Sequence, residues 1–136
     1  MNKKSSFALA VLGVIVLSSF LAGCDNSVRL KEEILLRPGQ TVSVSEENLK
    51  ITFDKVTADS RCPTGATCVW AGEVKCSVRI TQGGKVSLIN FIYPGAGNDY
   101  AKLTYKNRLY SFKVTPYPEL GKPIPQDKYR LILVIE

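Results

Sequence analysis

The densest group of potentially reactive side chains lies in the middle of the chain, in the stretch DSRCPTGATCVWAGEV (residues 59–74). Its candidate residues are Asp59, Arg61, Cys62, Cys68 and Trp70, the only tryptophan of the chain. Thiols can form a disulfide, bind a metal or carry out redox chemistry. A closed zinc site needs four ligands, and a thioredoxin-like pair needs a CxxC spacing, which is missing here. We therefore expect no metal and no cofactor.

A disulfide is the first expectation for this stretch. Cys62 and Cys68 close a ring of seven residues, CPTGATC, in which Pro63 and Gly65 favour a tight bend. Such a bridge stabilises by about 2.4 kcal/mol on the chain-entropy estimate. Cys76 shares the parity of the apolar residues around it, which is typical of a buried free thiol. Bridges from Cys76 to Cys62 or to Cys68 remain open alternatives.

The chain contains no histidine. This excludes Ser-His-Asp and Cys-His catalysis, histidine-ligated zinc and an imidazole base. We expect a protein that is not an enzyme. A hydrolase or transferase that uses a carboxylate with lysine or tyrosine remains the alternative.

The same stretch also supplies a candidate binding loop, formed by Asp59, Arg61, Pro63, Thr64, Thr67 and Trp70. Asp59, Arg61 and Trp70 each have a structural interpretation as well. Asp59 can accept hydrogen bonds from the loop backbone, and Arg61 can pair with Asp59 or reach a carbonyl. Trp70 has the parity of Cys68 and Val74, so an unbroken strand would place it in the core beside the bridge. An exposed Trp70 would instead mark a recognition surface.

The N-terminus has the pattern of an export signal. Lys3 and Lys4 precede an apolar run, residues 7–17, that is shorter than a transmembrane helix requires. The following Leu21-Ala22-Gly23-Cys24 resembles a bacterial lipobox, which implies cleavage after residue 23 and acylation of Cys24, palmitate included. Two or more acyl chains anchor a protein stably. An ordinary signal peptide or an uncleaved anchor helix is the alternative.

These features predict a lipoprotein of the bacterial cell envelope that faces the periplasm or the exterior. Asp25, directly after the cysteine, resembles the retention signal for the inner membrane. Removal of residues 1–23 takes away Lys3 and Lys4 and lowers the net charge from +6 to +4. The remaining charge is too small and scattered for nucleic acid. The expected partners are the membrane, through the lipid anchor, and an envelope protein.

The remaining chain has the pattern of a β-sandwich. No helical periodicity extends over three turns, and short β-rich runs alternate with Gly, Pro, Asn and Asp. Strands are expected at 33–37, 41–45, 49–54, 73–81, 85–93, 109–115 and 129–135, the last central and covered on both faces. We therefore predict an all-β chain with one antiparallel sandwich, immunoglobulin-like or Greek-key, of seven or eight strands. The predicted division is a signal peptide (1–23), Cys24 with a tether (24–32) and the domain (33–136).

The run D-S-R-C-P-x4-C-x-W-A-G, from Asp59 to Gly72, resembles the hallmark of a family of small exported bacterial β-domains and lipoproteins. Members of that family also end in a strand like KYRLILVIE, the C-terminus of this chain. Cys76 is not part of the pattern, so the resemblance implies the Cys62–Cys68 bridge. The resemblance implies no activity.

Together, these observations predict an envelope lipoprotein that acts as a non-catalytic binding or accessory module. Connections between strands are the usual contact surfaces of a rigid sandwich, here residues 61–67 and 94–100. A stapled loop that inserts into the cleft of an envelope protease is one concrete form of this prediction. A purely structural envelope protein is a further alternative.

Overall fold

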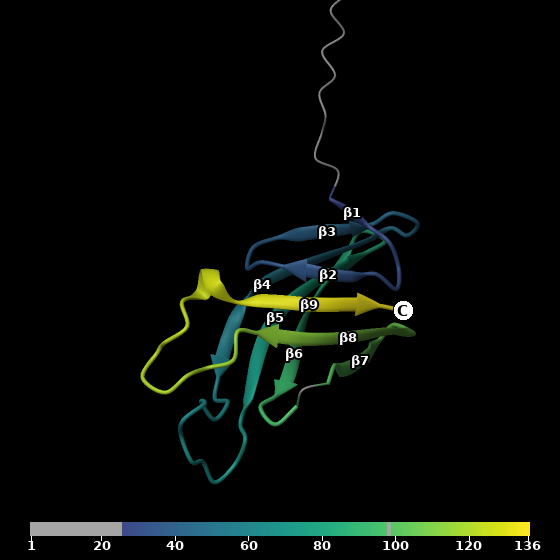
Figure 1. The fold of residues 1–136 in the computed structure, drawn as a ribbon. Coiled ribbons are helices and arrows are strands. Elements are labelled where there is room, and N and C mark those ends of the chain that lie inside the picture. The colour runs from purple at the N-terminus through teal and green to yellow at the C-terminus, as the bar shows by residue number, and fades with distance from the viewer. Residues whose placement is uncertain (1–25, 98) are drawn as a thin grey trace, which may run out of the picture.

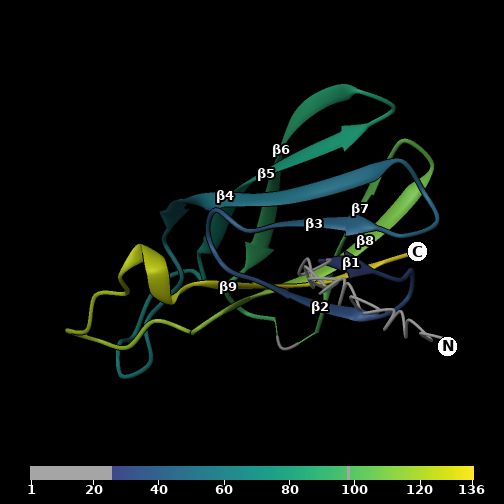
Figure 2. The same ribbon diagram turned by 90° about the horizontal axis from the view of Figure 1, so that it is seen from above.

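The computed structural model describes residues 26–97 and 99–136. The predicted signal segment, 1–23, and the predicted lipidation site, Cys24, lie outside these residues. The described part is a sandwich of two β-sheets (Figures 1 and 2), as the sequence predicts. No helix among the described residues is long and apolar enough to cross a membrane.

The first sheet has five strands in the order β1-β3-β4-β5-β6. Its strands are β1 (Ser27–Val28), β3 (Thr41–Val44), β4 (Leu49–Asp59), β5 (Glu73–Gln82) and β6 (Lys85–Pro94). Four of them form an antiparallel meander, and β1 pairs in parallel with β3. The tether predicted at 24–32 includes β1, which pairs with β3 at the edge of this sheet through Ser27 and Val28.

The second sheet has four antiparallel strands in the order β2-β9-β8-β7. They are β2 (Glu33–Leu36), β7 (Ala101–Tyr105), β8 (Arg108–Thr115) and β9 (Arg130–Ile135). A short 3₁₀ helix, Gln126–Lys128, precedes β9. The described chain thus has nine strands, and β1 and β7 were missed by the sequence prediction.

Alternation of apolar and polar residues explains the core between the two sheets. Leu49, Ile51 and Phe53 of β4 are buried, and so are the apolar residues of β5 that share one parity, namely Val74, Cys76, Val78 and Ile80. From the opposite sheet, Tyr110 and Phe112 pack against Phe91 of β6, with ring centroids 5.9 and 4.6 Å apart. These contacts fix the two sheets against one another.

The last strand, β9, is central as predicted, between β2 and β8. Only one face of it is fully buried, with Leu131, Leu133 and Ile135 in the core. Ile132 and Val134, on the other face, are half-exposed. The prediction that both faces are covered is therefore wrong, because no third layer packs on the outside of this sheet among the described residues.

Candidate functional site

Two long connections meet at one end of the sandwich, at the bottom and the left in Figure 1. Residues 60–72 connect β4 to β5, and residues 116–129 connect β8 to β9. The amide of Thr64 donates to the Pro118 carbonyl at 2.9 Å, and the amide of Leu120 donates to the Thr64 carbonyl at 3.0 Å. We call residues 60–72 together with 116–122 the stapled tip.

The predicted disulfide between Cys62 and Cys68 is present, with the Cα atoms 5.9 Å apart. The alternative bridges from Cys76 are wrong, because Cys76 is a free thiol that is buried in the core. Burial raises the pKa of the Cys76 thiol to about 12. The thiolate is the reactive form of cysteine, so Cys76 is inert near neutral pH.

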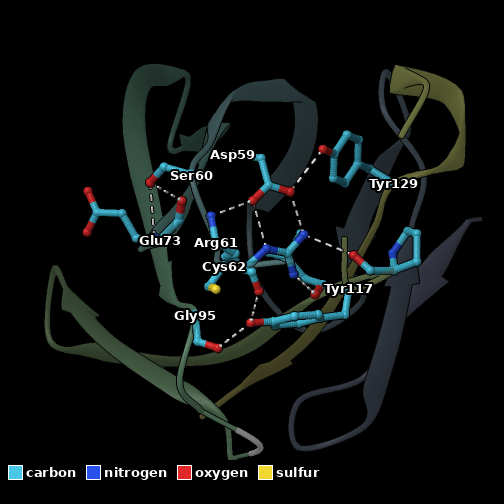
Figure 3. A network of polar contacts seen from close by, with 10 residues as sticks. Asp59, Ser60, Arg61, Cys62, Glu73, Gly95, Tyr117 and Tyr129 are labelled. Atoms are coloured by element: carbon cyan, nitrogen blue, oxygen red, sulfur yellow. Dashed lines mark hydrogen bonds and ion pairs between the residues drawn. The ribbon is translucent and has the colours of Figure 1, made fainter. Parts of the chain in front are cut away.

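A buried ion pair lies next to Cys62, at the start of the stapled tip (Figure 3). The guanidinium of Arg61 has no exposed surface, and its Nη2 donates to Oδ2 of Asp59 at 2.6 Å. The Nε and the backbone amide of Arg61 both donate to Oδ1 of Asp59, at 2.9 and 3.2 Å. Asp59 therefore forms the predicted turn with the loop backbone and also the predicted pair.

Arg61 also joins the stapled tip to the second sheet. Its Nη1 donates to the carbonyl of Val114 at 3.1 Å, and its Nη2 donates to the carbonyl of Pro116 at 2.9 Å. From the start of β9, the hydroxyl of Tyr129 donates to Oδ2 of Asp59 at 3.0 Å. One buried side chain thus holds residues from both connections and both sheets together.

Tyr117 closes this network from the outside. Its ring lies 5.2 Å from the guanidinium carbon of Arg61, within the range of a cation–π contact. Its hydroxyl donates to the carbonyls of Cys62, at 2.8 Å, and Gly95, at 2.9 Å (Figure 3). The loop that follows β6 is thereby fixed to the stapled tip.

The electrostatics of the network indicate a structural role. Burial opposes ionisation of Asp59, but hydrogen bonds and charge attraction from Arg61 outweigh it and lower the pKa of the carboxyl. Burial and the hydrogen bond to Asp59 raise the pKa of Tyr129 to about 12. Near neutral pH, Asp59 therefore stays ionised and Tyr129 stays neutral. Every buried side-chain nitrogen and oxygen of the described residues has a hydrogen-bond partner.

Trp70 is not in the core, which corrects the structural interpretation of that residue. An extended chain from Cys68 to Val74 would place Trp70 in the core, but Gly72 has a φ of +70° and breaks the alternation. The strand β5 begins only at Glu73. Trp70 consequently turns outward, with 76% of its surface exposed.

Several large apolar side chains of the stapled tip are exposed. Val69 is fully exposed beside Trp70, and Leu120 and Tyr117 of the second connection are 62% and 41% exposed. The ionised groups of the stapled tip are paired: Arg61 with Asp59, and Lys122 with Glu119. A groove lined by residues 116, 117, 119, 122–125 and 128 adjoins this surface.

The structure divides the predicted binding loop into two groups. Asp59 and Arg61 point into the protein and belong to the network, whereas Thr64, Thr67 and Trp70 are exposed and Pro63 is half-buried. Sequence reasoning missed Val69 and Leu120. The sequence did contain a signal for the exposure of Val69. Two large apolar residues, Val69 and Trp70, follow a disulfide-bonded cysteine in a loop that ends at Gly72.

The second predicted contact loop, 94–100, is held by hydrogen bonds to its backbone. The hydroxyl of Tyr93 donates to the carbonyls of Gly97 at 2.8 Å and Asp99 at 3.2 Å, and the amide of Gly95 donates to the Gly72 carbonyl at 2.8 Å. Among the described residues, no group of three or more Cys, Asp or Glu side chains is placed to hold a metal ion. No family model, curated protein or solved structure matches this chain.

Proposed function

We propose that this protein is a lipid-anchored lipoprotein of the bacterial cell envelope that acts as a non-catalytic binding module, with the stapled tip as its contact surface. The single observation that carries the proposal is the exposure of Val69 and Trp70 on a segment whose backbone is fixed. Trp70 has 76% of its surface in solvent, although a tryptophan is among the residues that gain most from burial. A partner supplies that burial.

The contacts beneath the stapled tip support this proposal. The disulfide, the Asp59–Arg61 pair and the backbone bonds between Thr64 and the second connection hold the loop before any partner arrives. A loop that is already ordered loses little conformational entropy on binding, so more of the contact energy contributes to affinity. Tryptophan is also over-represented among the residues that dominate protein–protein affinity.

The composition of the stapled tip indicates the chemistry of the partner. Its exposed side chains are apolar or uncharged apart from the Lys122–Glu119 pair. A complementary surface is therefore an apolar pocket or cleft on an envelope protein, flanked by groups that bond the hydroxyls of Thr64 and Thr67. A protease whose cleft admits the loop is one such partner.

The position of the stapled tip also supports the proposal. The short strand β1, which follows the proposed anchor at Cys24, pairs with β3 next to the first residues of β4. The stapled tip follows the last residue of β4, Asp59, at the opposite end of that strand (Figure 1). A tip at this position is presented away from the tethered end of the domain.

We expect Trp70→Ala to abolish capture of the partner from envelope extracts without a loss of stability. Loss of a central tryptophan typically costs 2 kcal/mol or more of binding energy, which is roughly a thirtyfold loss of affinity. The free energy of unfolding should change by less than about 0.5 kcal/mol, because Trp70 lies on the surface. Quantitative pull-down and urea unfolding measure the two effects.

Leu35→Ala is the matched control, since Leu35 is also a large exposed apolar residue, at 56%, but lies on β2. It should leave capture unchanged. Equal recovery of the partner by the wild type and by Trp70→Ala would contradict the proposed surface.

A further inference from the structure

The four edge strands of the two sheets differ in how they are protected against pairing. The edges are β1 and β6 in one sheet and β2 and β7 in the other. The strand β1 has two residues, β2 has four and begins with Glu33, and β7 has five and contains Lys102. Short length and charged side chains are the usual protection of an edge. The strand β6 has ten residues, and its only charge is Lys85 at the first position.

The outer face of β6 is apolar as well. Val86, Leu88 and Ile92 share one parity and are 62%, 66% and 46% exposed. The opposite parity carries Phe91 and Tyr93 into the core. Because β6 lies at the edge, these exposed side chains form a stripe directly beside the open side of the strand.

The backbone groups on that open side can be assigned from the turn between β5 and β6. Gln82 and Lys85 flank a two-residue turn, and the residues that flank such a turn form a hydrogen-bonded pair. At the other end of β6, the amide of Gly95 donates to the Gly72 carbonyl. Gly95 and Lys85 are both odd-numbered, so the two ends agree that the odd-numbered residues of β6 form the hydrogen bonds to β5. The residues of β6 whose amides and carbonyls face away from β5 are therefore Val86, Leu88, Asn90 and Ile92. No strand among the described residues pairs with them.

We infer that β6 pairs antiparallel with β6 of a second copy of this chain and joins the two five-stranded sheets into one. A twofold axis at Ile89 places Val86 opposite Ile92 of the second copy and Leu88 opposite its Asn90. This register uses all four free positions on each strand. If the twofold axis lay at Asn90 instead, Val86 would lie opposite Pro94 of the second copy. Proline has no N–H to donate, so that register would lose a hydrogen bond.

Charge also favours a second copy as the occupant. The single charge of β6, on Lys85, lies at one end of the strand, so an antiparallel pair places the two lysines at opposite ends. The chain as a whole carries a net charge of +6, so two copies repel one another in general. At the β6 edge no like charges lie opposite one another, so this repulsion is absent between the facing side chains. The pairing is isologous, because each copy offers the same surface.

Sedimentation of the detergent-solubilised full chain tests this inference. The wild type should sediment as a dimer. Leu88→Pro removes an amide that faces away from β5, and Leu88→Lys places a charge in the stripe, so each should raise the dimer dissociation constant at least about tenfold. Leu35→Lys is the control, because Leu35 is similarly exposed, at 56%, on another edge strand. It should leave the dimer intact.

Disulfide trapping tests the register. A mixture of Leu88→Cys and Asn90→Cys chains should give an oxidised dimer, because residues opposite one another in a hydrogen-bonded pair have Cα atoms about 5.5 Å apart. Each variant alone should give much less.

Three outcomes would overturn the inference. The first is a wild-type chain that stays monomeric throughout the accessible concentration range. The second is a dimer that survives both Leu88→Pro and Leu88→Lys. The third is a monomer that captures an extended strand of another protein and loses it with Leu88→Pro, which would assign the edge to a different partner.

Discussion

Replacing Arg61 with alanine is expected to lower the free energy of unfolding by about 3–5 kcal/mol. The change leaves the carboxylate of Asp59, whose side chain is only 11% exposed, without its partner. It also removes the hydrogen bonds to the carbonyls of Val114 and Pro116. Equilibrium unfolding in urea measures the loss.

Arg79→Ala is the matched control for this prediction. Arg79 pairs with Asp54 at 2.7 Å on the sheet surface, where the Arg79 side chain is 48% exposed. A surface pair of this kind contributes about 0–1 kcal/mol. Similar losses from Arg61→Ala and Arg79→Ala would contradict the role of the buried pair.

Acid should affect the same pair. The pKa of Asp59 is lowered in the folded protein, so its contribution to stability is present above the unfolded pKa and is lost as the pH falls through the folded pKa. The wild type should therefore lose this contribution below about pH 4. Asp59→Asn should lack this component of the acid dependence.

The second large effect is expected at Gly72. A Cβ at this position would lie 1.8 Å from the carbonyl oxygen of Ser60, and the φ of +70° disfavours any other residue. Strain at positive φ costs about 1–2 kcal/mol and overpacking about 1–3 kcal/mol more. Gly72→Ala should therefore lower the free energy of unfolding by about 2–5 kcal/mol, measured by thermal or urea unfolding.

Gly83→Ala separates the two causes. Gly83 also has a positive φ, +56°, but a Cβ at this position would have no atom within 4 Å. It should cost only the backbone strain, about 1–2 kcal/mol. If the two variants were equally stable, close packing of Gly72 against Ser60 would not be what fixes the stapled tip.

Alternation along the chain was sufficient to predict the sandwich. Leu49, Ile51 and Phe53 occupy the core because period-2 patterns determine which face of a strand is buried. The short strand β1 could not be predicted in this way, since two residues carry no pattern and it is held by pairing with β3. The strand β7 was missed although its residues AKLTY alternate, because a pattern of 5 residues is short.

The candidate site was harder to predict because it depends on the path of the loop. Local chemistry indicated the Cys62–Cys68 ring and the pairing of Asp59 with Arg61, and both are present. The outward turn of Trp70 depends on the positive φ of Gly72, which no periodicity reveals. The contact between Thr64 and the second connection joins residues more than fifty positions apart, so local sequence does not encode it.

Photo-crosslinking in living cells shows whether the stapled tip contacts an envelope protein. A photoreactive residue replaces the fully exposed Val69 in one chain and, as control, the exposed Lys50 at the opposite end of β4 in another. A discrete adduct with an envelope protein from position 69 alone is the predicted result. No adduct from position 69 in a stably folded chain, or the same adducts from both positions, would contradict a role of the stapled tip as contact surface.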